Sequence, residues 1–340
     1  MPTRRFQVII TDFLDDRLTI EQEVLSDIAD VSACQALHES ELVGRIEQAD
    51  AVMMYHNLSL SATSIDRLQR CRLIVRCGVG FDNVDHQHAA TKGIPVANVP
   101  DYGTEDVADS AIGLTLSLVR GIHRYNHQLQ AAQGAWSYTI AAPLRRLRGQ
   151  VFAVVGLGRI GTATALRAKA LGMDVRFYDP LKPDGYDKAL GIQRVESLRE
   201  LLRDAWVVSL HCPLTAQTRH IINQETLTWL SPGGYLINTA RGDCVELAAI
   251  PPAISDGRLA GAGIDVLPDE PPQPDNPLVA AWRDPKHPAY QRVIINPHAA
   301  FYSEQGLDDM RYKGSQACRR ALLDLPLRNV INGIPTARLS

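Results

Sequence analysis

The stretch that decides the fold is "VVGLGRIGTATALRAKALGMDVRFYD", residues Val154 to Asp179. Its glycines Gly156, Gly158 and Gly161 fit the pattern G-x-G-x-x-G. With 24 glycines in 340 residues, this pattern arises by chance in roughly one chain of this size in ten. The alternative explanation of the triplet is a tight turn that binds no ligand. The triplet alone therefore decides nothing, and the residues on either side of it carry the argument.

The flanks of the triplet supply a strand, a turn and a helix in that order. "VFAVV", directly before Gly156, is apolar and rich in β-branched residues. "RIGTATALRAKALG" follows, is rich in alanine without proline, and ends at the plausible C-cap Gly172. Glycines let the backbone approach a pyrophosphate, and the free N–H groups at a helix start favour its negative charge. This order predicts the phosphate-binding turn of a Rossmann domain.

Asp179 indicates which dinucleotide the turn would bind. It stands at the end of a second strand, "VRFY", and 18 residues after Gly161. An acid at this place can accept hydrogen bonds from the ribose hydroxyls of adenosine. Pro180 and Leu181 follow it, where an arginine would be expected for a 2'-phosphate. The sequence therefore favours NAD over NADP, with a turn that binds no nucleotide as the alternative.

Composition limits the classes of protein to which the chain can belong. Its 340 residues are 45% hydrophobic and 21% charged, which is ordinary for a globular protein of two domains. Thirty-five basic and 38 acidic side chains give a formal net charge of -3, so we expect no direct nucleic-acid partner. No apolar run reaches the roughly 20 residues of a membrane span, and the first residues do not resemble a cleavable leader. We therefore predict a cytoplasmic protein without a membrane partner.

Cysteine and histidine patterns do not favour a metal site. The six cysteines form no C-x-x-C motif, which is typical of reduced structural thiols. His123 and His127 have the spacing of one helical face but lack an acidic third ligand. The prediction is a protein without a bound metal ion.

Apolar runs alternate with helical patterns, which predicts an α/β fold with doubly wound parallel sheets. The predicted strands are 6–11, 51–56, 72–77 and 95–99 in a first sheet, and 151–155, 175–178, 206–210, 235–238, 261–264 and 293–295 in a second. The proline-free stretch 106–129 predicts one long helix that links two domains or packs on a partner chain. Pro251 and Pro252 should break or restart a helix, and residues 277–293 should form a long loop near His298.

Polar residues follow the strands predicted for the second sheet. In a doubly wound sheet, ligands bind beyond the carboxyl ends of the strands. The residues found there are His211, Cys212, Pro213, Thr239, Ala240, Arg241, Asp265, Asn296, Pro297 and His298. Taken singly, Arg241, His298 and Glu270 of "PDEPPQP" have an ordinary explanation as solvated surface groups. Their convergence at one edge of a sheet is what favours a functional site.

Long motifs connect the chain to a known family. They include "LIVRCGVGFDNVD" (73–85), "VVGLGRIG" (154–161), "SLHCPLT" (209–215), "LINTARG" (236–242) and "PHAAFYSEQ" (297–305). Through these motifs the chain resembles the D-isomer-specific 2-hydroxyacid dehydrogenases over nearly its whole length, and most closely their C-terminal-binding-protein branch. The resemblance implies a flavodoxin-like outer, substrate-binding domain formed by 1–105 with 300–340, and an inserted Rossmann NAD-binding domain at 106–299. It also implies a homodimer.

The resemblance assigns three catalytic residues. It makes Arg241 the clamp for the substrate carboxylate, His298 the acid/base and Glu270 the partner of His298. A guanidinium can hold a carboxylate through two parallel hydrogen bonds. An imidazolium can donate a proton to the oxygen of a carbonyl that accepts a hydride, and a carboxylate beside it favours that protonated form.

The resemblance also assigns residues to the cofactor and the substrate. The NAD site is expected to comprise Thr104, Gly156, Gly158, Arg159, Ile160, Gly161, Asp179, His211, Pro213, Thr239, Ala240, Asp265 and Ala300, with Asp265 near the carboxamide. The substrate is expected to contact Arg76, Val79, Gly80, Arg241 and Phe301. Phe301 is a departure, because the branch carries a tryptophan in this motif, and substrate size therefore stays open.

These observations predict an NAD-dependent oxidoreductase that interconverts a small 2-oxo acid and a D-2-hydroxy acid. The alternative is an NAD(H)-sensing co-regulator with little or no turnover. That alternative follows from the same resemblance, because the branch includes transcriptional co-repressors that bind short peptides and keep the same site residues.

Overall fold

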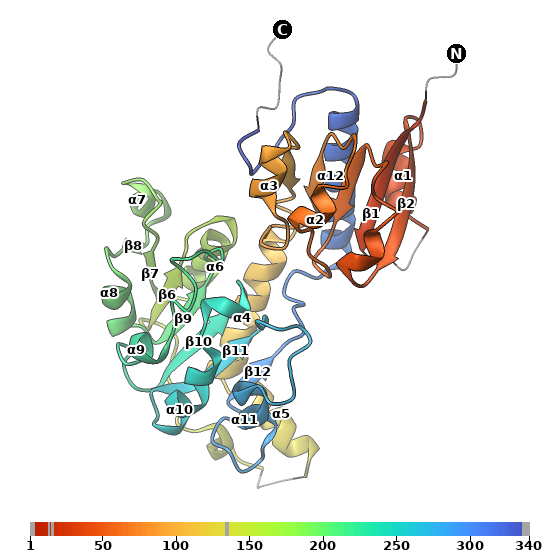
Figure 1. Ribbon diagram of the computed structural model, residues 1–340. Coiled ribbons are helices and arrows are strands. Elements are labelled where there is room, and N and C mark those ends of the chain that lie inside the picture. Colours follow the sequence, from red (N-terminus) through yellow and green to blue (C-terminus); the bar gives the residue numbers. More distant parts are fainter. Residues whose placement is uncertain (1–3, 13, 15–16, 133–135, 335–340) are drawn as a thin grey trace. The chain divides into compact units, whose positions relative to one another are not determined.

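The computed structural model describes residues 4–12, 14, 17–132 and 136–334, which form two compact units. One unit comprises Met1–Gly103 with Ser303–Ser340, and the other comprises Thr104–Tyr302. Each contains one parallel sheet with helices packed on it (Figure 1). The predicted fold class, two doubly wound parallel-sheet α/β domains, is confirmed. None of the helices in these described ranges is both long enough and apolar enough to cross a membrane.

The first unit contains a five-stranded sheet in the order β2-β1-β3-β4-β5, which is the flavodoxin-like order. Its strands are β1 (Phe6–Asp12), β2 (Ala29–Ala36), β3 (Ala51–Met54), β4 (Ile74–Arg76) and β5 (Val96–Asn98). Its helices are α1 (Thr19–Leu25), η1 (Glu39–Leu42), α2 (Ala62–Ile65), α3 (His86–Thr91) and α12 (Glu304–Leu322). Strand β2 was missed because "ADVSACQA", at the edge of the sheet, consists mainly of small and polar residues without an apolar run.

Helix α12 ties the C-terminal part of the chain to the N-terminal part. Its residues Met310, Cys318 and Leu322 are buried in the core formed with β1, β3 and β4. Arg311 binds the carboxylate of Glu21 in α1 through two hydrogen bonds of 2.7 and 2.6 Å, and the Glu21 side chain has no exposed surface. The first unit therefore depends on a buried ion pair between distant parts of the sequence.

The second unit contains a seven-stranded sheet in the order β12-β11-β10-β9-β6-β7-β8. Its strands are β6 (Val151–Val155), β7 (Asp174–Tyr178), β8 (Gln193–Arg194), β9 (Val207–Leu210), β10 (Gly234–Asn238), β11 (Leu259–Ile264) and β12 (Val293–Ile295). Its helices are α4 (Thr104–Val119), α5 (Ile122–Gln130), η2 (Tyr138–Ala141), α6 (Arg159–Ala170), α7 (Tyr186–Leu190), α8 (Leu198–Arg203), α9 (Gln224–Leu227), η3 (Gly242–Cys244), η4 (Leu247–Ala249), α10 (Ile250–Ser255) and α11 (Pro277–Arg283). The six predicted strands are confirmed. The seventh, β8, has two residues and no apolar pattern.

The long helix predicted at 106–129 is wrong, because the chain breaks it into α4 and α5. Gly121 lies at the break with φ of 65°, a left-handed conformation that side chains disfavour. A Cβ atom at this position would lie 2.4 Å from the methyl carbon of Ala141. Both the backbone angle and the close approach therefore require glycine here.

The two remaining expectations have different outcomes: the prolines restart a helix, which is one of the two predicted possibilities, and the predicted loop is partly helical. Pro251 and Pro252 lie in the first turn of α10, where proline is tolerated because its missing N–H has no partner inside the helix. They restart a helix after η4 instead of interrupting one. The loop predicted at 277–293 begins with helix α11, which Asn276 caps by accepting the N–H groups of Leu278 and Val279.

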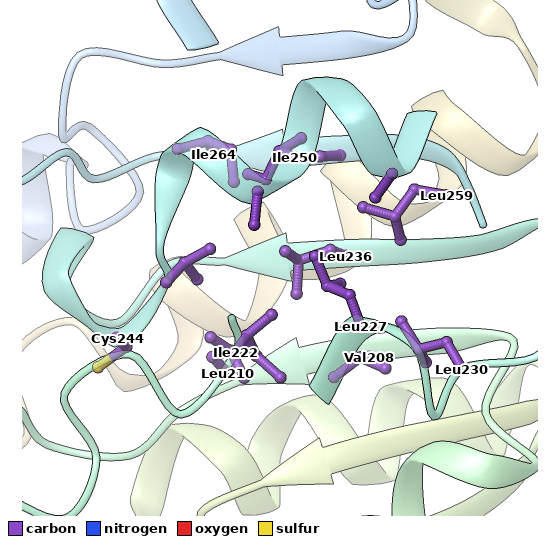
Figure 2. Packing of buried hydrophobic residues seen from close by; sticks show 14 of the residues in the cluster. Val208, Leu210, Ile222, Leu227, Leu230, Leu236, Cys244, Ile250, Leu259 and Ile264 are labelled. Atoms are coloured by element: carbon purple, nitrogen blue, oxygen red, sulfur yellow. The ribbon is translucent and has the colours of Figure 1, made fainter. Parts of the chain in front are cut away.

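A continuous apolar core supports one face of the second sheet (Figure 2). Leu210 of β9, Leu236 of β10 and Ile264 of β11 are fully buried, and Ile250 at the start of α10 packs into the same cluster. Each such side chain contributes roughly 1.5–3 kcal/mol when it leaves water. The strands that lead to the candidate site are therefore held in place by this core.

All six cysteines are free thiols, as predicted.

Candidate active site

The carboxyl ends of the parallel strands β6 and β9 to β12 lie at one edge of the second sheet. The strand order changes direction between β6 and β9, and such a switch point opens a crevice for a dinucleotide. The residues that follow these strands are Gly156, His211, Thr239 to Arg241, Asp265 and Asn296 to His298. The structure therefore brings the polar residues noted in the sequence to one edge.

Each glycine of the β6–α6 turn has a different physical role. Gly156 has φ of 87°, and a Cβ there would lie 2.8 Å from the backbone nitrogen of Cys212. A Cβ at Gly161 would lie 2.1 Å from the carbonyl oxygen of Gly156. At Gly158, by contrast, a Cβ would meet nothing within 4 Å. Two glycines therefore allow close backbone packing, and the third keeps open space in front of the turn.

The start of helix α6 fits a phosphate. Its N-cap residue Gly158 makes no side-chain capping bond, so the first N–H groups of the helix are not capped by a side chain. Arg159 and Ile160, both predicted cofactor residues, form the first turn. Oriented N–H groups and the positive end of the helix dipole favour an anion at this place.

The carboxylate of Asp179 lies beside the same turn. One of its oxygens accepts the N–H of Leu157 at 2.8 Å, and the other accepts the N–H of Leu181 at 2.9 Å. These bonds hold the carboxylate at the end of β7, and each oxygen retains capacity for a further hydrogen bond. This geometry fits an acid that accepts ribose hydroxyls.

Two buried polar atoms at this edge have no hydrogen-bond partner among the described residues. They are Oγ1 of Thr239, whose residue is only 9% exposed, and Nδ1 of His211. The other ring nitrogen of His211 lies 2.8 Å from Oγ of Ser209, and burial lowers the pKa of His211 to about 3. Unpaired buried polar atoms are uncommon in folded proteins and mark places where a ligand can bond. The residues present therefore fit a dinucleotide.

His298 and Glu270 form a hydrogen-bonded pair beyond β12 and β11. Nδ1 of His298 lies 2.7 Å from Oε2 of Glu270. The other carboxylate oxygen, Oε1, accepts the N–H of Leu267 at 2.9 Å, which fixes the orientation of Glu270. Because the contact uses Nδ1, the imidazole presents Nε2 on the opposite side of the ring. This is the arrangement of an acid/base histidine oriented by a carboxylate.

Asp265 anchors the segment that carries His298. Its residue is 1% exposed, and its carboxylate accepts the N–H groups of Ala299 and Ala300 at 3.0 and 3.1 Å. Burial raises the pKa of this carboxyl group, and the two N–H donors oppose that effect. The N–H of His298 also donates to the Asp265 carbonyl oxygen at 2.8 Å. The proximity of Asp265 to a carboxamide stays a prediction, whereas its anchoring role was not foreseen.

The loop that carries Arg241 packs against the loop that leads to Glu270. Asn238 stiffens the first loop, because its side chain donates to the Arg241 carbonyl oxygen at 2.9 Å and accepts the N–H of Ala240 at 3.0 Å. A Cβ at Gly242 would lie 2.1 Å from the carbonyl carbon of Leu267. The main chains at Gly242 and Leu267 are therefore in contact, and only glycine fits at this position. This contact joins the loop of Arg241 to the loop of Glu270.

The remaining predicted residues fall in both units. Phe301 packs edge-on against His298, with ring centroids 6.1 Å apart. Thr104 is the first residue of α4, and Pro213 lies in the loop after β9. In the first unit, Arg76 is 6% exposed and donates to the Cys77 carbonyl oxygen at 2.9 Å. The roles of Arg76, Val79 and Gly80 toward a substrate stay predictions. Sequence reasoning missed Ser209 and Asn238, whose only signal was a polar residue near the end of an apolar strand.

Comparison with known proteins identifies the family of the chain. Residues 112–300 match the model of the D-isomer specific 2-hydroxyacid dehydrogenase, NAD binding domain. The chain is 32% identical over 317 residues to C-terminal-binding protein 1 of Caenorhabditis elegans, which covers 91% of this chain and 42% of that protein. It is 30% identical over 335 residues to D-3-phosphoglycerate dehydrogenase of Methanocaldococcus jannaschii, which covers 98% of this chain and 61% of that protein. The chain thus spans only part of the length of both relatives.

A solved structure shows the same fold. The D-lactate dehydrogenase of Aquifex aeolicus, complexed with NAD and lactic acid, superposes with a TM-score of 0.82 and 30% identity, over 92% of this chain and 94% of that one. The predicted resemblance and the predicted cofactor class, NAD, are confirmed by the family match. The chain belongs to the D-isomer specific 2-hydroxyacid dehydrogenase family, with the family's NAD-binding domain in the unit Thr104–Tyr302.

Proposed function

We propose that this chain is an NAD-dependent dehydrogenase that interconverts a 2-oxo acid and a D-2-hydroxy acid. The observation that carries the proposal is the 2.7 Å contact between Nδ1 of His298 and Oε2 of Glu270. It lies at the same sheet edge as the glycine turn and the loop of Arg241. A nucleotide site, a cationic clamp and an acid/base pair are the groups that this reaction needs.

The chemistry of the chain's own residues follows from this geometry. NAD supplies the hydride chemistry when it is bound. Arg241 would hold the substrate carboxylate through parallel hydrogen bonds and polarise the adjacent carbonyl. His298, as imidazolium, would donate a proton to the carbonyl oxygen during reduction, and as neutral imidazole would remove it during oxidation. Glu270 orients the ring through its contact with Nδ1.

The direct test is NADH oxidation by the purified protein with a panel of 2-oxo acids, from glyoxylate and pyruvate to branched and aromatic analogues. His298→Gln should lower kcat by about 10²- to 10⁴-fold, the range for general acid–base groups. Arg241→Gln should raise KM and lower kcat/KM. The matched controls are His220→Gln and Arg203→Gln, whose side chains are 45% and 71% exposed. Equal turnover in the site variants and the controls would contradict the assigned roles.

A second candidate function is an NAD(H)-sensing co-regulator, which the 32% identity to C-terminal-binding protein 1 favours. In that case the protein would bind NADH but reduce none of the acids. It would instead bind short hydrophobic peptides saturably, and this binding would depend on NADH. The two assays together separate the candidates.

The proposed assembly is a homodimer. Several large apolar side chains between residues 122 and 138 of the second unit are exposed: Ile122 by 56%, Leu129 by 41%, Trp136 by 90% and Tyr138 by 82%. Such a concentration of exposed apolar surface is typical of a protein interface. Light scattering should give twice the 37.4 kDa chain mass, and a concentration-independent monomer would contradict the dimer.

A further inference from the structure

Asn238 is a fully buried polar residue at the end of an apolar strand. It is the last residue of β10. In the sheet it pairs with Leu210 of β9 on one side and with Ile264 of β11 on the other, both labelled in Figure 2. Its carbonyl oxygen also accepts the N–H of Asp265 at 2.9 Å. The main chain of Asn238 is therefore held from both sides, and its side chain starts from a fixed point.

The side-chain amide of Asn238 spans the turn that leads to Arg241. Its Oδ1 accepts the N–H of Ala240 at 3.0 Å, and its Nδ2 donates to the Arg241 carbonyl oxygen at 2.9 Å. The N–H of Cys244 donates to the same oxygen at 3.1 Å. A buried amide is costly unless its polar atoms are bonded, and here both are used within one turn. The amide therefore acts on the shape of this turn.

These bonds control the peptide group on which the guanidinium of Arg241 is anchored. The bond to the N–H of Ala240 holds the peptide group before Ala240, and the bond to the Arg241 carbonyl oxygen holds the one after Arg241. Between them lies the carbonyl oxygen of Ala240, which accepts an N–H of Nη1 of Arg241 at 2.8 Å. Asn238 thus sets the orientation of this anchor from both ends.

We infer that Asn238 is a positioning residue for Arg241, and that it fixes the guanidinium where it can bind the carboxylate of a 2-oxo acid. The inference rests on the proposed function. The turn requires an amide, because one atom must accept a hydrogen bond while the other donates one. An ionised aspartate has the same shape but can only accept, and it would direct a negative charge at the Arg241 carbonyl oxygen.

The acid/base pair is held by other bonds. Nδ1 of His298 contacts Glu270, Glu270 accepts the N–H of Leu267, and the N–H of His298 donates to the Asp265 carbonyl oxygen. None of these bonds uses the side chain of Asn238. A change of this side chain should therefore affect the binding of the substrate carboxylate more than the transfer of the proton.

The test is a double-mutant cycle in NADH oxidation, at NADH concentrations that saturate each variant. Asn238→Asp should raise the KM of a 2-oxo acid about tenfold, the effect of one lost hydrogen bond, with a smaller change in kcat. In a protein that already carries Arg241→Gln, the same change should alter KM less than about twofold, because Asn238 acts through Arg241. Asn238→Ala, which buries no charge, gives the same comparison if Asn238→Asp does not fold.

Asn223→Asp is the matched control. Its Nδ2 donates to the His220 carbonyl oxygen at 2.9 Å, and its Oδ1 accepts the N–H of Thr226 at 3.0 Å. It thus loses the same kind of bond as Asn238→Asp but at a different turn. KM should stay unchanged in this control, whereas urea unfolding reports the loss of stability in both variants.

The outcomes separate the inference from the proposed function. If Asn238→Asp lowers the apparent kcat but has the KM of Asn223→Asp, Asn238 only stabilises the fold, and the inference is wrong while the dehydrogenase stands. Additive effects of Asn238→Asp and Arg241→Gln on KM would also overturn the inference. Failure of the proposed function gives another result: the unchanged protein, saturated with NADH, would reduce no acid and would not bind oxamate, a 2-oxo carboxylate analogue, saturably. Arg241 would then bind no carboxylate, and the inference would be wrong as well.

Discussion

The burial of His211 predicts a specific loss of stability in mild acid. Its pKa falls from the ordinary 6.5 to about 3 in the folded protein because the ring is buried. Protonation would require an acceptor for Nδ1–H, and that atom has no partner among the described residues. Below pH 6.5 the unfolded chain therefore binds a proton at this residue that the folded chain does not bind. His211 therefore does not lower the free energy of unfolding above pH 6.5, but it lowers this free energy progressively as the pH falls from 6.5 toward 3.

The size of this effect follows from the pKa difference. Each pH unit between the two pKa values costs about 1.4 kcal/mol, so a change from pH 7 to pH 5 should cost about 2 kcal/mol through His211 alone. Replacement by glutamine keeps a polar group beside Ser209 and removes the titration. His211→Gln should therefore lose about 2 kcal/mol less than the unchanged protein over the same pH interval.

The assay is urea unfolding at pH 7 and pH 5, followed by tryptophan fluorescence. All four tryptophans lie between residues 104 and 302, so the signal reports the unit that contains His211. His220→Gln serves as control, because that side chain is 45% exposed. If His211→Gln and His220→Gln show the same pH dependence as the unchanged protein, the argument from burial is wrong.

Three further predictions concern packing. Gly158→Ala should leave the unfolding midpoint unchanged, because its methyl group meets no protein atom, but should weaken NADH binding by about tenfold or more. Gly161→Ala should destabilise the fold by about 1–3 kcal/mol, because its methyl group would collide with the carbonyl oxygen of Gly156. Both can be measured by calorimetry and fluorescence, and equal effects would contradict the two roles. Gly121→Ala should cost about 1–2 kcal/mol in urea unfolding, because φ is 65° there. Arg311→Met should cost about 3–5 kcal/mol by leaving Glu21 buried without its partner, and adding Glu21→Gln should restore part of that loss in circular dichroism melts.

The sequence was most informative about the second sheet. Strands β6 and β12 have the predicted bounds, because short apolar runs bordered by glycine or polar residues leave little choice. The break at Gly121 could not be predicted, since a glycine within a helical pattern is tolerated in many proteins. The contact with Ala141, which excludes a side chain at position 121, is likewise not visible in the sequence.

The candidate site was predictable where it follows from topology. Arg241 and His298 are each the third residue after the end of a strand, and parallel strands bring such residues to one edge. The anchoring bonds of Asp265 were not predictable, because they join a buried carboxylate to backbone N–H groups that carry no sequence signal.

The contact at Gly242 has a consequence for regioselectivity. Because this glycine packs on the Leu267–Pro268 backbone, the distance from the guanidinium loop to the carboxylate that orients His298 is fixed by main chain. In the proposed reaction, an acid held by Arg241 would present the carbon next to its carboxylate to the imidazole. An acid whose oxo group lies one carbon farther from the carboxylate would not present its carbonyl carbon to the imidazole. Substitutions around Phe301 would then change which 2-oxo acid fits, but not which carbon reacts.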